Sequence, residues 1–246
     1  MDKRYGTPST LSSPVSETGG ETSEPTATQT QAEAAGVTFE CRDGRAEPYA
    51  ATPTLSFRLR ITEAQQRPVH NIALRCEIQI QPRRRRYGQA ETERLHDLFG
   101  VAERWSQTLR PLRFADLFVL VPGFNATTEI DLRVPCTYDF EVSSAKYFHA
   151  LDDGEIPLLF LFSGTVFRRT ATGFTIDPVP WDHEASYDLP VRVWQEMMDL
   201  YFPDSGWMRV RRDTLDAVHA FKTRHTLPNW DDALLTLLDK AGEVQT

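Results

Sequence analysis

The sequence is poor in cysteine, and the few cysteines are scattered. Among 246 residues there are three, with no Cys-x-x-Cys pair: Cys41, Cys76 and Cys136. An odd, unclustered set argues against a disulfide framework and fits a reducing compartment. Cys76 and Cys136 stand at apolar positions of alternating segments, so we expect them to be small buried hydrophobes in strands.

Long apolar segments are also missing. Residues 1–20 contain no apolar core of the kind found in a secretory signal, and the longest apolar run, 156–162, is too short to span a bilayer. These absences predict a cytoplasmic protein without a membrane span. The formal net charge of -8 argues against binding to nucleic acid phosphates.

The familiar signatures of catalysis are lacking as well. The chain has no Gly-x-Ser-x-Gly, no His-Glu-x-x-His, no phosphate-binding loop and no dinucleotide fingerprint. This lowers the expectation of an enzyme without excluding one, and the sequence predicts no cofactor. We expect one set of aromatic residues to form core and not a cofactor pocket, namely Tyr147, Phe148, Phe160, Phe162 and Phe167.

Composition divides the chain into three regions. Residues 1–36 are rich in Ser, Thr, Pro, Gly and Glu and have few aliphatic side chains, which predicts a disordered polar tail. Residues 37–178 carry strand signals, with a helical insertion near 89–109 that Gly100 interrupts. Residues 179–246 predict a C-terminal helical extension of the same domain.

Alternating hydrophobicity marks the strands. The clearest segment, 72–80, places Ile, Leu or Cys at every second position, the period of a half-buried strand. Similar signals predict strands at 37–41, 57–61, 117–121, 130–136 continuing to Val142, 156–167 and 174–176. Many short strands with turns between them favour an antiparallel β-sandwich with C-terminal helices packed on it, and an open-sheet α+β domain is the alternative.

Capping residues mark the C-terminal helices. Asp188, Asp213 and Asn229 each precede an apolar pattern of helical spacing, which predicts three helices that begin near them. A short strand at 207–210 is also expected, and 143–151 is ambiguous between helix and strand.

The most conspicuous local feature is a run of four arginines, Arg83, Arg84, Arg85 and Arg86. Adjacent guanidinium groups can grip a phosphate or an acidic partner, or they can simply end a strand in a solvated loop. We predict partner binding at this run and around Trp194 and Trp207 in the C-terminal part. Arg209, Arg211 and Arg212 form a second basic group.

Two other polar groups have a chemical and a structural interpretation. Asp182 and His183 are adjacent, and with His149 they would make a metal site if the fold brought them together. A polar loop is the simpler interpretation. Asp152, Asp153 and Glu155 lack the spacing of a calcium loop, so turn chemistry is expected there.

Several stretches resemble one known family: residues 135–142, 145–155, 179–182, 207–215 and 227–232. Together they are similar to an uncharacterised actinobacterial family that has only a domain-of-unknown-function label, family 6084, over about residues 53–238. Members of that family tend to be encoded beside genes for nickel–iron uptake hydrogenase and its maturation factors. The resemblance implies a cytoplasmic accessory role and supplies no catalytic residues.

Two hypotheses of different classes follow. The first is a non-enzymatic accessory or scaffold protein whose partner is a protein, for instance a hydrogenase subunit or maturation factor. The second is a metal-binding protein or enzyme that uses His149, Asp182 and His183. A holdase is a further alternative, and it would need an exposed apolar groove. The sequence does not indicate the oligomeric state.

Overall fold

The computed structural model describes residues 36–136, 142–180, 182–203, 205 and 210–243. The chain divides into two units, residues 1–32 and 33–246, and the first lies outside the described residues. The predicted disordered tail over 1–36 and the predicted strand over 207–210 also fall outside them, apart from Gly36 and Val210, neither of which belongs to a strand.

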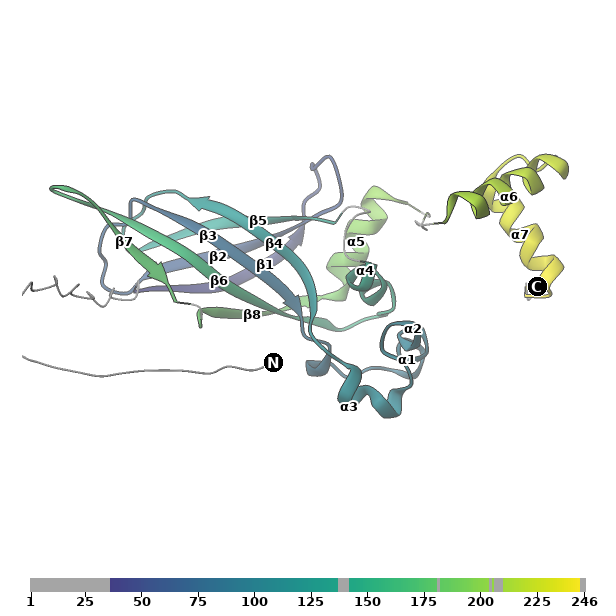
Figure 1. Cartoon of the computed structure of the whole chain (residues 1–246), viewed down its shortest axis with the longest axis horizontal. Helices are drawn as coiled ribbons and strands as arrows, with labels where there is room; N and C mark the ends of the chain where they lie inside the picture. Colours follow the sequence, from purple (N-terminus) through teal and green to yellow (C-terminus); the bar gives the residue numbers. More distant parts are fainter. Residues whose placement is uncertain (1–35, 137–141, 181, 204, 206–209, 244–246) are drawn as a thin grey trace, which may run out of the picture. The chain divides into compact units, whose positions relative to one another are not determined.

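Two antiparallel sheets form the centre of the fold (Figure 1). A three-stranded sheet has the order β1-β2-β5, from β1 (Val37–Ala46), β2 (Thr54–Glu63) and β5 (Thr127–Pro135). A five-stranded sheet has the order β4-β3-β6-β7, with β8 paired to the first half of β6. Its strands are β3 (Asn71–Ile80), β4 (Leu112–Val121), β6 (Glu155–Thr170), β7 (Gly173–Val179) and β8 (Glu184–Pro190).

The two sheets face each other across an aromatic interior. Phe39 of β1 stacks on Phe162 of β6 with ring centroids 4.3 Å apart, and Phe57 of β2 meets Phe160 of β6 edge-on at 5.3 Å. These contacts join opposite sheets, as in a β-sandwich. The predicted antiparallel, β-rich fold with added helices is confirmed.

Alternation along β3 shows why the sandwich forms. Every second side chain points inward and is at most 1% exposed: Ile72, Leu74, Cys76, Ile78 and Ile80. The residues between them point to the outer face of the five-stranded sheet, because successive strand residues face opposite ways. At roughly 25 cal/mol per Å² of apolar surface, each buried aliphatic side chain stabilises the fold by about 1.5–3 kcal/mol.

The long strand β6 has a central position in its sheet, since it pairs with β3, β7 and β8. Both faces of β6 are covered only at its start, where residues 156–158 are all buried. Further along, Leu159 and Leu161 are half-buried and Ser163 is exposed. Beyond residue 158, the outer face of β6 is therefore only partly covered.

Short helices follow β3, as expected. They are η1 (Pro82–Arg84), α1 (Gln89–Arg94), α2 (His96–Phe99), η2 (Ala102–Arg104) and α3 (Trp105–Thr108). Gly100 ends α2 with φ 74°, a left-handed conformation that glycine adopts without strain. The ambiguous segment is a helix, α4 (Val142–His149). The predicted strand through Val142 is thus wrong at that residue, and 137–141 lie outside the described residues.

The C-terminal region holds α5 (Val191–Tyr201), α6 (Arg212–Arg224) and α7 (Trp230–Ala241). Asn229 caps α7 as predicted, with its Oδ1 accepting from the Asp232 amide at 2.7 Å. Asp213 lies inside the first turn of α6, whose N-cap is Arg211. Asp188 is not a cap: it lies in β8 opposite Pro157, so pairing with β6 prevailed over local capping chemistry.

Candidate functional site

Large apolar side chains are exposed on the outer face of the five-stranded sheet. Phe118 and Leu120 of β4 are 79% and 68% exposed, and Phe174 and Ile176 of β7 are 56% and 62% exposed. We call these four side chains the outer-face patch. Contiguous exposed apolar surface on a folded protein commonly marks an interaction site.

The β4 residues and the β7 residues of the patch are connected through the pairing of the strands between them. Leu120 lies opposite Ala73 of β3, Ala73 lies opposite Thr165 of β6, and Thr165 lies opposite Pro178 of β7. Ile176 is opposite Phe167 in the neighbouring row. The apolar side chains are therefore spread across four adjacent strands, with small or half-buried residues between them.

A shallow groove runs beside β4 within this face. It is lined by Ala73, Leu74, Arg75, Phe118, Val119, Leu120, Ser163 and Gly164. Gly164 has φ 147°, and a Cβ at this position would lie 2.1 Å from the carbonyl oxygen of Ala73. The absence of a side chain thus lets β6 approach β3 closely at the floor of the groove.

A charged cluster forms the rim of the patch near Phe118. The Arg75 guanidinium donates to Asp116 at 2.6 and 3.0 Å and lies 5.6 Å from the centroid of the Phe118 ring. Arg113 donates to the same carboxylate at 2.5 Å. The hydrogen bond from Arg75 lowers the pKa of Asp116 despite its partial burial. The rim is therefore ionised at neutral pH, and the aromatic ring beside it stays uncovered.

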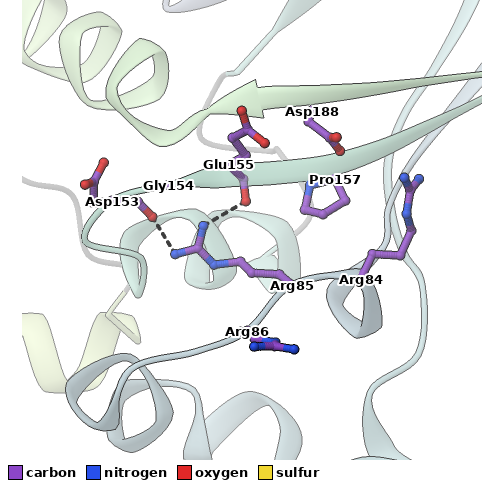
Figure 2. A pocket seen from close by; sticks show the side chains of 8 residues that line it. All are labelled: Arg84, Arg85, Arg86, Asp153, Gly154, Glu155, Pro157 and Asp188. Atoms are coloured by element: carbon purple, nitrogen blue, oxygen red, sulfur yellow. Dashed lines mark hydrogen bonds between the residues drawn. The ribbon is translucent and has the colours of Figure 1, made fainter.

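The arginine run divides into one half-buried member, Arg85, and three exposed ones. The Arg85 side chain is only 9% exposed, and it donates to the Glu91 carboxylate at 2.5 Å. It also donates to the carbonyl oxygens of Asp153 at 2.5 Å and Glu155 at 2.7 Å (Figure 2). Arg85 therefore ties the loop after β3 to the start of β6. This role is structural, because both terminal nitrogens of its guanidinium are already engaged in these hydrogen bonds.

The other three arginines are exposed. Arg83 donates to the carbonyl oxygen of Ser106, and Arg84 donates to the hydroxyl of Ser186 at 3.3 Å. Arg84 and Arg86 line a shallow pocket together with Asp153, Glu155 and Asp188 (Figure 2). Since carboxylates balance the guanidinium groups, the pocket offers little net attraction to a multiply charged anion.

Trp194 does not form the exposed surface expected of it. Its side chain is 3% exposed and stacks on Phe148 of α4 at 4.4 Å with an interplanar angle of 17°. It joins α5 to α4 in the interior. The same apolar pattern on a helix occurs whether that face packs inside its own protein or against a partner. The sequence therefore could not show whether Trp194 is buried or exposed. Trp207 lies outside the described residues.

Of the three residues of the predicted metal site, Asp182 and His183 lie together, whereas His149 has other neighbours. His183 lies 3.5 Å from Asp182 and edge-on to Phe39, whereas His149 ends α4 and lies edge-on to Trp194 at 5.8 Å. Burial lowers the pKa of His149. Among the described residues no group of three or more His, Cys, Asp or Glu side chains is placed to hold a metal ion. The structure does not favour this alternative.

Of the three acidic residues for which turn chemistry was expected, Asp153 lies in a bend, and Glu155 begins β6. Asp152 pairs with Arg94 at 2.6 Å, while Asp153 and Glu155 offer backbone oxygens to Arg85. The cysteines are free and buried, as predicted for Cys76 and Cys136. Burial raises the pKa of all three thiols, to about 12 for Cys41 and Cys136, which suppresses the reactive thiolate.

The outer-face patch was not predicted from the sequence. The signal that could have found it is the double-sided apolar pattern of β4, where Leu117, Val119 and Val121 face inward while Phe118 and Leu120 face outward. A strand that is apolar on both faces needs cover on both. In β4 the inner cover is the sandwich core, and the outer side chains are bare.

The chain belongs to a family of unknown function, DUF6084, whose model matches residues 34–246. This confirms the domain-of-unknown-function family and extends the likeness beyond the range expected from the sequence. No curated protein matches the chain. Within the described residues, none of the helices has the length and apolar character needed to cross a membrane.

Proposed function

We propose that the protein is a non-enzymatic accessory protein that binds another protein through the outer-face patch. The observation that carries this proposal is the exposure of Phe118 and Leu120 beside the groove on the edge strand β4. Aromatic and aliphatic side chains of this kind are the usual anchors of protein interfaces.

The edge position of β4 adds a second means of recognition. An edge strand presents backbone amide and carbonyl groups that a strand from a partner can pair with. Apolar side chains on the same strand would then supply specificity. The arginine run remains a candidate for secondary contacts, through Arg84 and Arg86 at its exposed pocket.

We further propose that the partner is a nickel–iron hydrogenase subunit or maturation factor, in the cytoplasm. The support is the resemblance to an actinobacterial family encoded beside hydrogenase genes. Three free, buried thiols are in keeping with a reducing compartment. The net charge of -8 favours a protein partner over nucleic acid.

Affinity capture from a hydrogenase-expressing actinobacterial host tests both parts. The wild-type chain is compared with a double variant, Phe118→Thr with Leu120→Thr, which removes apolar area while keeping residues that suit a strand. Tyr49→Thr is the matched control, because Tyr49 is 95% exposed and lies outside the patch. We expect hydrogenase proteins with the wild type and the control, and at least tenfold less with the double variant.

Two results would contradict the proposal in different ways. Capture of no hydrogenase protein by the wild type would remove the hydrogenase role. Equal capture by the double variant would remove the outer-face patch as the binding site. Capture of many unrelated unfolded proteins would favour the holdase alternative, since a holdase binds apolar segments without regard to identity.

A further inference from the structure

The pair of helices α6 and α7, here the C-terminal hairpin, has little interior of its own. No residue of α6 is buried, and in α7 only Ala233 is. The two helices have 13 and 12 residues, and isolated helices below roughly 12–15 residues are marginal in water. Their stability therefore calls for a further surface to pack against.

The apolar side of α7 is wider than α6 can cover. Ala233 is buried, whereas Leu235 and Leu238 are 55% and 46% exposed. At about 100° per residue, these two leucines are turned roughly 140–160° away from Ala233. On α6, Leu215 is 45% exposed as well. Helix α7 thus has a second apolar side, which lies away from Ala233, and α6 adds an exposed leucine on the face of its half-buried Val218.

The two helices carry opposite charge. Helix α6 has three basic and two acidic side chains, and α7 has one basic and three acidic ones. Exposed Arg212 and Arg224 stand on the first helix, and exposed Asp231 and Asp239 stand on the second. A partner that lays an acidic helix on α6 and a basic helix on α7 would match both.

We propose that this partner is the same hairpin of a second copy of the chain. A two-fold arrangement that places α6 of each copy against α7 of the other makes each complementary contact twice, as isologous interfaces do. The product is a four-helix bundle in which the leucines form the shared core. This goes beyond the proposed function, since it leaves the outer-face patch free for a different protein.

Light scattering coupled to size exclusion tests the proposal on the full chain at micromolar concentration. We expect the wild type at twice the chain mass, and Leu235→Glu with Leu238→Glu at the chain mass. Leu200→Glu is the matched control, because Leu200 is 53% exposed on α5, outside the hairpin; it should stay at twice the mass. Circular dichroism of each variant reports whether the sandwich remains folded.

Cross-linking of Leu238→Cys identifies what covers the leucine, because the native thiols are buried. Cross-linked dimers support the proposal. A chain-mass wild type at all concentrations, or a dimer that survives the double glutamate variant, overturns it. An intrachain cross-link between Leu238→Cys and Leu120→Cys also overturns it, and would assign the hairpin to the outer-face patch of its own chain.

Discussion

At the residue scale, a buried ionic cluster joins the two sheets. Glu63 ends β2 and is 1% exposed; its carboxylate accepts from the Arg67 amide at 2.6 Å and from Arg168 of β6 at 3.1 Å. Arg168 also donates to Asp177 at 2.8 Å. Breaking a buried pair leaves an uncompensated charge, which costs more than the pair contributes.

Glu63→Gln tests this cluster through its pH dependence. Burial raises the pKa of Glu63, but the hydrogen bonds from Arg67 and the charge of Arg168 outweigh burial and hold the pKa below its usual value. The stabilisation is thus present above the unfolded pKa of about 4.3 and is lost as the pH falls through the lower folded pKa. We expect the variant to lower the free energy of unfolding by about 3 kcal/mol at neutral pH, with a smaller difference in acid.

Urea unfolding measured across the acidic range provides the readout. Glu129→Gln is the control, because its pair with Arg60 is exposed at 35% and 38% and is expected to contribute about 0.5 kcal/mol. A constant difference between wild type and Glu63→Gln from neutral to acidic pH would show that the charge of Glu63 does not stabilise the fold.

At the element scale, pairing between β3 and β6 depends on a backbone approach that only glycine permits. Gly164 lies opposite Leu74 in the ladder, and its φ of 147° is rare for other residues. The same strand supports the core on one face and the groove on the other. A change here should therefore affect stability and the outer-face patch together.

Gly164→Ala is expected to lower the free energy of unfolding by at least about 3 kcal/mol, from backbone strain and the clash with Ala73. Gly173→Ala is the control: its φ is 150°, yet no atom lies within 4 Å of an added Cβ. It should show the strain alone, about 1–3 kcal/mol. Equal losses in the two variants, measured by chemical unfolding, would mean that the close approach is unimportant.

The contact between helices α4 and α5 shows how one element determines which surface of another is buried. Trp194 and Phe148 stack between them, so the apolar face of α5 is part of the core. The helical spacing of its apolar residues predicted the helix, while its packing against β1, β2 and β8 decided which surface that face covers.

At the scale of the whole molecule, the three thiols report on both sheets. Cys41 lies in β1, Cys76 lies in β3, and Cys136 follows β5. All are buried with raised pKa values. Each becomes accessible only when its part of the sandwich opens, so their reactivity measures how cooperatively the fold unfolds.

A thiol reagent applied at about pH 8, near the ordinary cysteine pKa of about 8.5, should modify none of the three in the native protein. All three should react together in denaturant, at the midpoint seen by circular dichroism. Rapid native-state labelling of one cysteine, located by mass spectrometry, would contradict this and would identify the sheet that opens by itself.

Much of the strand pattern could be predicted because it is local. The inward faces of β2 and β3, the stop at Gly100 and the cap at Asn229 follow from the period of two, from left-handed backbone and from side-chain capping. The strand β8 could not be predicted in this way, because Asp188 and Pro190 resemble a helix start. Its pairing partner, β6, is distant along the chain.

The candidate site was less predictable than the fold. The arginine run was visible in the sequence, but contacts with Glu91, Asp153 and Glu155 turned Arg85 into a structural residue. The outer-face patch depends on which face of β4 the sandwich leaves bare. The metal hypothesis depended on convergence of His149 with His183, which a sequence cannot show.

The sequence by itself determined an antiparallel β-rich chain with C-terminal helices and buried cysteines, because side-chain periodicity and caps act within a few residues. Tertiary structure alone decided which apolar surfaces are covered: Trp194 is inside, while Phe118 and Leu120 are outside. The physical reason is that burial is a property of facing elements, and the strands and helices that face each other are far apart along the chain.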